Sequence, residues 1–413
     1  MNSRERILAA IDHMEPDRIP IDLGATPSSG ISAIAYHNLK KYLEISEGNT
    51  YIYDVVQQLA QPEDFMLDHF GIDVVDIGRL FNTNKNDWYT INMADGNSAL
   101  YPIWFRPKAE KDGSHTAFNQ SGKVIARMPH KATFYDQTYF PYLDGYPGDF
   151  KDLDKAMDQV LWSSFVHSPW DHQNEDDFWD NLRMNTKNLR ISTDKALMVV
   201  VGCNLFEWGT FLRRMDNFMM DLYLEPVNVE RLLDVLVGKH LEFLEKVCKS
   251  VGDIVDIVRF GDDLGMDSGP FMDPETYRKF FKPRHRILCD FVKSNSQMRT
   301  FLHSCGSIYD LLPDLIEAGF EIINPVQTTC RNMEPEKLKI EFGKDITFWG
   351  GGADTRTILN LAKPEEVKRH VSERCEILAP GGGFVFNTVH NILPEVPPEN
   401  IVAMFEAVNE FNK

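Results

Sequence analysis

Short apolar runs alternate with helical stretches along the second half of the chain, and this alternation constrains the fold more than any other feature. Near-continuous apolar runs are typical of parallel strands buried on both faces, and consecutive parallel strands need a crossover helix between them. Residues 72–77 resemble an earlier strand, and residues 18–22 are a candidate for a further one. Seven or eight such units favour a (β/α)8 TIM barrel of the α/β class, with an open doubly wound sheet as the alternative. The later runs are residues 196–202, 254–260, 298–303, 320–324, 346–349 and 383–386.

Residues 82–142 show a different sequence pattern, without the alternation of apolar runs and helical stretches. Three segments rich in aromatic and branched residues (88–92, 99–105 and 123–128) are separated by Asp-Gly, Asp-Gly and Ser-Gly turn signals, which indicates antiparallel hairpins. We expect an antiparallel β-meander, inserted after the first barrel strand, that serves as a lid or an edge sheet at one end of the barrel. A helical connector over residues 151–189 then leads back to the barrel. The 413 residues are thereby predicted to form one barrel domain with a β insertion.

The charge balance excludes several classes of partner. A formal net charge of −19, from 43 Lys plus Arg against 62 Asp plus Glu, argues against nucleic acid and anionic membranes, because no broad basic surface is available to neutralise phosphates. No apolar stretch approaches the roughly 20 residues of a membrane-spanning helix, and the N-terminus has no signal-peptide core. Six cysteines without a paired framework suggest a reducing compartment. We therefore expect a cytoplasmic protein, either a monomer or a homodimer.

His303 and Cys305 end one apolar run and stand directly before Gly306. Residues i and i+2 of a strand point to the same side, so the imidazole and the thiol converge, and the glycine lets the backbone turn sharply. These are the two commonest types of zinc ligand, and His390, after another apolar run, is a third candidate. Three protein ligands with an open fourth position are typical of a catalytic zinc site. The alternatives are a buried thiol at 305 and a hydrogen-bonded histidine at 390.

Other residues at the ends of the runs are candidates because barrel active sites lie at the C-terminal ends of the strands. Glu207 and Asp263 are candidate general acids, and Glu207 could instead be a fourth metal ligand or begin a helix. Asp262 could contact substrate, orient a ligand histidine or interact with a helix N-terminus. Substrate contacts are also expected from Asn324, Gln327, Trp349, Gly351 and Asn387, with Trp208 and Phe386 as further aromatic walls.

Several stretches of the sequence resemble the uroporphyrinogen decarboxylase superfamily. They are residues 301–320 followed by Asn324-Pro-Val-Gln327, residues 348–352, residues 386–401, and the N-terminal residues 4–10 and 16–20. The resemblance covers almost the whole chain apart from the inserted meander, and it implies a (β/α)8 barrel. The decarboxylase itself uses no cofactor and holds a substrate with eight carboxylates through an Arg-Gln-Ala-Gly-Arg segment. Residues 21–31, which stand at that place, contain no arginine.

The second branch of the superfamily consists of zinc-dependent methyltransferases that exchange methyl groups with corrinoid proteins or thiols. Their zinc is held by a His-x-Cys pair and a later Cys; His303 and Cys305 match the pair, and His390 stands at the third position. The resemblance implies a zinc methyltransferase that moves a methyl group from a small O-methyl donor, favoured to be a methoxylated aromatic, to the cobalt of a corrinoid (cobalamin) carried by a partner protein. The alternatives are a metal-free decarboxylase and a non-catalytic barrel that binds a tetrapyrrole or corrinoid.

Overall fold

A parallel sheet of seven strands curls through the centre of the computed structural model, which describes residues 1–412. Its strand order is β18-β17-β16-β15-β12-β11-β4, with every neighbouring pair parallel. The expected strands are therefore confirmed. Their bounds are β4 Val74–Asp76, β11 Ala196–Gly202, β12 Ile257–Gly261, β15 Arg299–His303, β16 Ile322–Asn324, β17 Thr347–Trp349 and β18 Phe384–Val385.

The segment around Ile21 lies between the two edges of this sheet. Ile21 forms a parallel bridge with Phe386, next to β18. On its other side the Asp73 N–H, just before β4, donates to the Ile21 carbonyl over 2.9 Å. Ile21 thus takes the eighth position of the predicted barrel. Since this segment precedes β4 in the chain, the β insertion follows the second barrel position rather than the first.

The interior of the barrel is divided into an apolar layer and a polar layer. The strands contribute inward-facing apolar side chains that form one buried cluster, and helix α1 (Ser3–Ile11) closes it from the N-terminal side of the strands with Ile7, Ala10 and Ile11. Two positions further along a strand the side chain faces inward again, and four strands and the segment just after β18 carry a polar residue there. The pairs are Val74 and Asp76, Ile257 and Arg259, Phe301 and His303, Ile322 and Asn324, and Val385 and Asn387.

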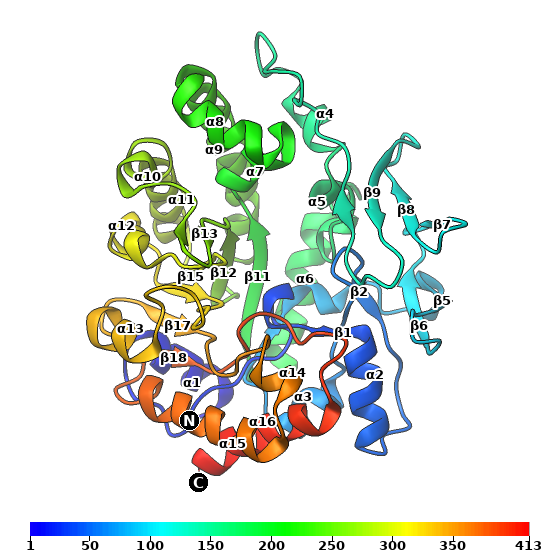
Figure 1. Cartoon of the computed structure of the whole chain (residues 1–413), viewed down its shortest axis with the longest axis vertical. Helices are drawn as coiled ribbons and strands as arrows, with labels where there is room; N and C mark the ends of the chain where they lie inside the picture. The colour runs from blue at the N-terminus through cyan, green and yellow to red at the C-terminus, as the bar shows by residue number, and fades with distance from the viewer. Residues whose placement is uncertain (413) are drawn as a thin grey trace.

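Helices cover the outside of the sheet (Figure 1). The longest, α9 (Pro226–Val251), packs against α6 (Phe178–Ser192) and α11 (Lys282–Asn295) through its buried apolar stripe. Helix α1 begins at a capping box, in which Asn2 and Glu5 satisfy each other's backbone N–H groups. The remaining helices are α2 Ala33–Tyr42, α3 Asp64–Phe70, α7 Phe206–Arg213, α8 Met215–Leu224, α10 Pro274–Phe280, α12 Leu312–Ala318, α13 Pro335–Phe342, α14 Ile358–Leu361, α15 Pro364–Leu378 and α16 Pro398–Phe411.

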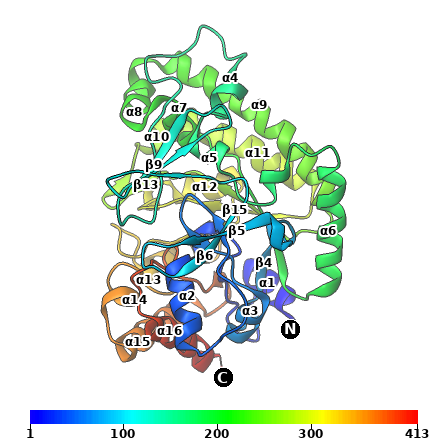
Figure 2. The same cartoon turned by 90° about the vertical axis from the view of Figure 1, so that its right-hand side faces the viewer.

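The predicted antiparallel insertion is present and consists of two units, which face the viewer in Figure 2. A hairpin is formed by β5 (Trp88–Asn92) and β6 (Ser98–Pro102), and a separate sheet has the order β10-β9-β8-β7. The second unit comprises β7 Lys108–Ala109, β8 His115–Phe118, β9 Val124–Met128 and β10 Asp136–Gln137. The Gln137 side chain donates to the Phe211 carbonyl over 2.7 Å, which ties the insertion to α7. The insertion therefore lies beside the helix that follows β11.

The connector between the insertion and β11 contains the short helices α4 (Leu153–Met157) and α5 (Leu161–Ser164), then α6. A small sheet of order β1-β3-β2 (Ile31–Ser32, Leu59–Ala60 and Ile52–Asp54) and the pair β13 and β14 (Gly265–Met266 and Gly269–Pro270) complete the structure. Both ends of the chain lie in the lower part of Figures 1 and 2, with the N-terminus beside α1. Within residues 1–412, none of the helices combines the length and the apolar character that crossing a bilayer requires.

Candidate metal centre and cavity

His303, Cys305 and His390 come together at the C-terminal ends of the strands. One donor atom from each residue can be chosen so that the three atoms lie within 4.8 Å of one another. The Cys305 Sγ is 3.5 Å from the His303 Nε2, and the two imidazole rings meet edge-on with centroids 5.6 Å apart. Around a tetrahedral zinc ion, a sulfur and a nitrogen ligand are about 3.6 Å apart. The donor types and their spacing therefore fit zinc.

Asn324 fixes the orientation of the His303 ring. The Asn324 side-chain N–H donates to the Trp349 carbonyl over 2.8 Å, so its oxygen faces the other way, toward the His303 Nδ1 at 2.7 Å. That oxygen can only accept, which makes the His303 Nδ1 the donor and leaves the Nε2 lone pair free on the side of Cys305. A buried side chain that orients a ligand histidine in this way is typical of metal sites.

The loop that carries Cys305 is held in place on both sides. The Asp263 carboxylate accepts from the Cys305 N–H over 2.8 Å, and the Gln327 side-chain oxygen accepts from the Gly306 N–H. Gly306 has a φ of +83°, and a Cβ there would lie 2.2 Å from the Gly265 backbone. Only glycine fits this position, so the expected sharp turn after Cys305 is confirmed.

His390 reaches the site from a strained loop. Its φ of 78° is a left-handed conformation that residues other than glycine adopt rarely. The neighbouring backbone is pinned on both sides, because the Val389 N–H donates to the Ala353 carbonyl and the Ile392 N–H to the Gly30 carbonyl. These contacts maintain a conformation that would otherwise cost free energy, and they turn the imidazole toward His303.

Burial controls the protonation of all three residues. It lowers the pKa of His303 well below its ordinary value, with the charge of Arg259 as the next cause, and it also lowers the pKa of His390. Burial, then Asp263 and Glu207, raise the pKa of the Cys305 thiol well above its ordinary value. Both imidazoles are therefore neutral and can act as ligands, whereas the thiol needs a nearby cation to lose its proton.

A cavity of about 650 Å³ opens onto the two histidines. Its wall combines strand ends, α7, α9 and the connector that precedes α6. The apolar part of the wall is largely aromatic and includes Phe134, Trp162, Phe165, Trp170, Trp208, Phe211 and Phe243. Such a volume and such a lining are typical of sites for small molecules.

The predicted acids Glu207 and Asp263 also line the cavity. Glu207 lies in the first turn of α7 and accepts a hydrogen bond from the Asn204 side chain. Burial raises the pKa of Glu207 well above its ordinary value, and the charge of Asp263 acts in the same direction. Burial also raises the pKa of Asp263. Each carboxyl in its charged form disfavours ionisation of the other, so the pair favours the uptake of a proton.

The six residues expected to contact substrate do not line this cavity, and their contact with substrate stays a prediction. Asp262 is fully buried and accepts from the Phe206 and Glu207 N–H groups, so it holds the start of α7. Trp349 belongs to the apolar layer, where its indole N–H donates to Asp22 over 2.8 Å. Asn324 and Gln327 hold His303 and the Cys305 loop, and Gly351 and Asn387 are buried.

Sequence reasoning missed Arg259, which projects from β12 into the same cavity. Its signal was present, because a charged residue that shares the inward face of a strand with Ile257 and Gly261 must lie inside the barrel. It also missed the connector as a wall of the cavity. Trp162 and Trp170 follow no strand, so their position depends on how the connector folds back.

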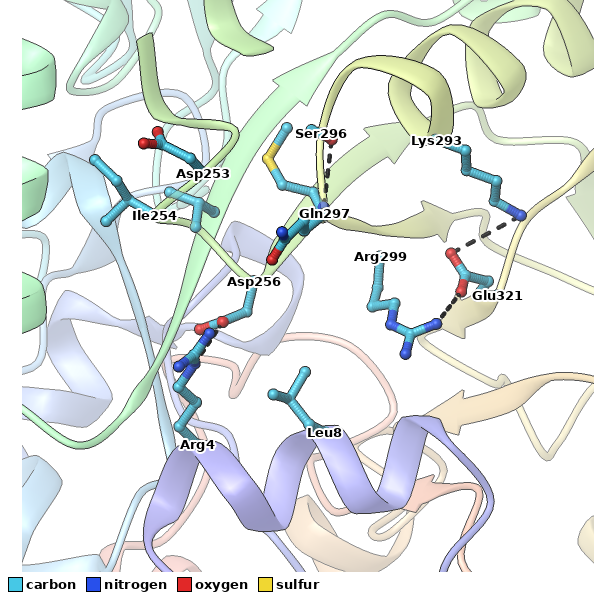
Figure 3. A pocket seen from close by; sticks show the side chains of 12 residues that line it. Arg4, Leu8, Asp253, Ile254, Asp256, Lys293, Ser296, Gln297, Arg299 and Glu321 are labelled. Carbon is cyan, nitrogen blue, oxygen red and sulfur yellow. Dashed lines mark hydrogen bonds and ion pairs between the residues drawn. The ribbon is translucent and has the colours of Figure 1, made fainter. Parts of the chain in front are cut away.

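A second, polar depression of about 460 Å³ lies at the opposite end of the strands (Figure 3). Its charged side chains are paired with acids: Arg4 with Asp256, and Arg299 and Lys293 with Glu321. These pairs hold α1 and the starts of the strands together. This end of the barrel therefore presents a structural network, whereas the metal-ligand types are at the other end.

Comparison with known proteins supports the fold. The family model described as uroporphyrinogen decarboxylase (URO-D) matches residues 203–411, which include the three candidate ligands. A solved structure of a methyltransferase from Methanosarcina mazei has a TM-score of 0.59 at 16% identity, and the comparison covers all of both chains. At that identity the likeness shows the fold alone.

The curated relatives have two different activities. The uroporphyrinogen decarboxylase of Aliivibrio fischeri (strain MJ11) is 26% identical over 198 residues, which cover 46% of this chain and 51% of the relative. The methylcobamide:CoM methyltransferase MtaA of Methanosarcina barkeri is also 26% identical, over 185 residues that cover 44% of this chain and 49% of the relative. The chain thus spans about half the length of the curated relatives it matches.

Proposed function

Because this chain belongs to the uroporphyrinogen decarboxylase (URO-D) family, which contains more than one chemistry, we propose that it is a zinc-dependent methyltransferase. It would move a methyl group from a small O-methyl donor to the cobalt of a corrinoid held by a partner protein. The single observation that carries the proposal is the convergence of His303, Cys305 and His390 within 4.8 Å at the cavity. The relative named methylcobamide:CoM methyltransferase supports it.

Zinc would be held by the His303 Nε2, the Cys305 Sγ and the His390 ring, with a fourth position open to the cavity. When bound, it would supply Lewis acidity to the donor oxygen that carries the methyl group. Asn324 keeps the His303 lone pair directed at the site, and Asp263 holds the backbone of Cys305. The role of these two residues is to keep the ligands in position before the donor arrives.

One of the two acids of the cavity would protonate the leaving group. When the methyl carbon leaves, the donor oxygen keeps the bonding electrons and needs a proton. Glu207 lines the cavity and its raised pKa keeps a proton available at neutral pH. Asp263 is the second candidate acid. The aromatic wall meanwhile excludes water and accommodates a flat apolar body.

Decarboxylation without a metal is the second candidate, because several relatives are named uroporphyrinogen decarboxylases. The cavity argues against a substrate with many carboxylates. Its cationic lining consists of Arg259 and Lys239, and Lys239 is already paired with Asp154 at 2.5 Å. Residues 21–31 supply no arginine either. Release of carbon dioxide from an acidic substrate that persists after chelation would favour this candidate.

The decisive experiment is the metal content of the purified protein. We expect near-stoichiometric zinc in the wild type and its loss in the double variant His303→Ala, Cys305→Ala. Cys330→Ala is the matched control, because this buried cysteine lies outside the ligand cluster. Methyl transfer to cob(I)alamin, monitored by the absorption spectrum, should be lost in the variant that loses zinc. Wild-type protein that stays metal-free after incubation with zinc, or transfer that survives the double substitution, would refute the proposal.

A further inference from the structure

The Arg259 guanidinium faces the cavity without a partner. Among residues 1–412 it forms no ion pair and no side-chain hydrogen bond, and its Nε is buried with no acceptor. Buried charges in proteins are almost always paired, because an isolated charge is costly away from water. An unpaired cation in a cavity of this size therefore points to an anionic group that arrives with a ligand.

The strand position of Arg259 and the nearby Gly261 determine where the guanidinium lies. Arg259 follows Ile257 on the inward face of β12, one step above the apolar layer. A Cβ on Gly261 would lie 2.9 Å from the Arg259 Nη1 and 3.0 Å from the Asn204 Nδ2. The absence of a side chain at Gly261 thus makes room for the guanidinium at the rim of the barrel.

The nearby acids interact with Arg259 through their charge but accept no hydrogen bond from it. Glu207 and Asp263 form no ion pair with it, and each has another partner: the Asn204 side chain for Glu207 and the Cys305 N–H for Asp263. The charges of both acids act on Arg259 without a direct ion pair. The guanidinium N–H groups therefore still lack acceptors and can donate to an anionic ligand.

A second polar group nearby also lacks a partner. The Tyr53 hydroxyl is buried without a hydrogen bond, and its ring contacts His167, which lines the cavity, with centroids 5.4 Å apart. Burial raises the pKa of Tyr53, the charges of Asp54, Asp76 and Asp22 act in the same direction, and the charge of Arg259 opposes them. The hydroxyl is thus a neutral, unpaired donor beside the cavity wall.

The other residues of the cavity wall indicate which kind of ligand bears this anionic group. Trp162, Phe165, Trp170, Trp208, Phe211 and Phe243 surround the cavity. The Trp170 indole N–H donates to the Val200 carbonyl over 2.5 Å, which fixes its ring. Aromatic walls favour a flat ring as the body of the ligand. The ligand class that fits both features is an aromatic ring with a small anionic substituent.

We infer that Arg259 binds the carboxylate of an aromatic acid, and that the methyl donor of this enzyme is a methoxylated aromatic carboxylic acid. The identity of the donor rests on the proposed methyltransferase function, whereas the carboxylate subsite rests on Arg259 and the cavity. In the bound state the planar guanidinium would pair with both carboxylate oxygens, a geometry that a lysine cannot reproduce. The methoxy group would then lie toward His303 and His390.

The test is calorimetric titration with the three methoxybenzoate isomers and the three corresponding methoxybenzamides, which have a similar shape but no charge. We expect at least one benzoate to bind the wild type about 10- to 100-fold more tightly than its amide. Arg259→Met should lower the affinity for that benzoate to the affinity for its amide. Lys239→Met is the matched control, because Lys239 lines the same cavity but is paired with Asp154, and it should keep the preference.

The amide also reports on the fold, since a correctly folded Arg259→Met variant binds it as the wild type does. If that variant loses the amide as well, Arg259→Gln and Arg259→Lys take its place, and both should weaken the preference. Equal binding of acid and amide by the wild type, a preference that survives loss of Arg259, or no binding of any isomer would each overturn the inference. Acid binding without methyl transfer to cob(I)alamin would refute the proposed function and the donor assignment, but keep the carboxylate subsite.

Discussion

Acidification should destabilise the protein through His240, a buried histidine of α9. Its Nε2 donates to the Asn204 carbonyl over 2.8 Å, and burial lowers its pKa to about 4. In the unfolded chain a histidine titrates near 6.5. The folded state therefore resists protonation of His240 in a pH range where the unfolded state accepts a proton readily, and this difference changes the free energy of unfolding.

The sign and the size follow from these two pKa values. Above pH 6.5 the residue is neutral in both states and contributes no difference. As the pH falls toward 4 the unfolded state gains the proton first, so stability is lost across that window. Each unit of difference in pKa corresponds to about 1.4 kcal/mol, which gives a total loss of about 3 kcal/mol, most of it reached by pH 4.5.

Two buried carboxyls work in the opposite direction. Burial raises the pKa of Asp22 and of Asp76 to about 6, above the ordinary value for aspartate, so each one adds stability as the pH falls through the same window. The wild-type curve alone would mix these contributions. The informative quantity is the difference between the wild type and His240→Gln, which keeps a side-chain N–H donor and does not titrate.

The assay is urea unfolding followed by tryptophan fluorescence at pH 7.5, 6.5, 5.5 and 4.5. The stability of the wild type relative to His240→Gln should fall by about 2.5 kcal/mol between the first and the last of these values. His130→Gln, at an exposed position, controls for the loss of an imidazole. Parallel curves for wild type and His240→Gln would refute the claim that burial keeps His240 neutral.

Three further substitutions test the site and the packing. Asn324→Leu removes the acceptor of the His303 Nδ1 proton, so zinc affinity measured against a chromogenic chelator should fall about 10- to 100-fold; unchanged affinity would contradict the orienting role. Gly209→Ala would place a Cβ 2.1 Å from the Phe218 ring and should lower the free energy of unfolding by about 1–3 kcal/mol in urea. Gly238→Ala, in the interior of α9 with open space around it, should instead raise it by about 0.5–1 kcal/mol, and equal effects of the two substitutions would refute this account of the packing.

The alternation of apolar runs and helices was sufficient to predict the parallel sheet, because each strand is buried on both faces and its sequence shows it. Boundaries were less certain for a physical reason. The run 254–260 was expected to be a strand throughout, yet β12 begins at Ile257. The Asp256 carboxylate pairs with Arg4 and Arg190 and accepts from the Leu197 N–H. A side chain thus takes one backbone donor of the ladder, although the Asp256 N–H still donates to the Leu197 carbonyl.

For the site, the spacing of His303 and Cys305 was informative because both residues lie on one short segment. The position of His390 depends on a loop pinned to Ala353 and Gly30, which no local pattern reveals. The sequence interpretation placed Trp349 at the substrate because it considered only that the side chain points inward, and not its position along the barrel axis. It is level with Phe301, one layer below His303, and its ring contacts Phe301 with centroids 5.4 Å apart.

The two layers of the barrel also explain why chemistry belongs at one end. The apolar layer, closed by α1, has no free polar group, and the charges of the depression beyond it are paired. The polar layer above it is different: the Arg259 Nε, one oxygen of Asp76 and both polar atoms of Asn387 are buried without partners. Each such group costs about 1–3 kcal/mol in the folded state. Because a ligand that meets Arg259 removes part of this cost, binding should stabilise the fold as well as position the substrate. Of these groups Arg259 lines the cavity, so it is the one whose cost a bound ligand can reduce directly.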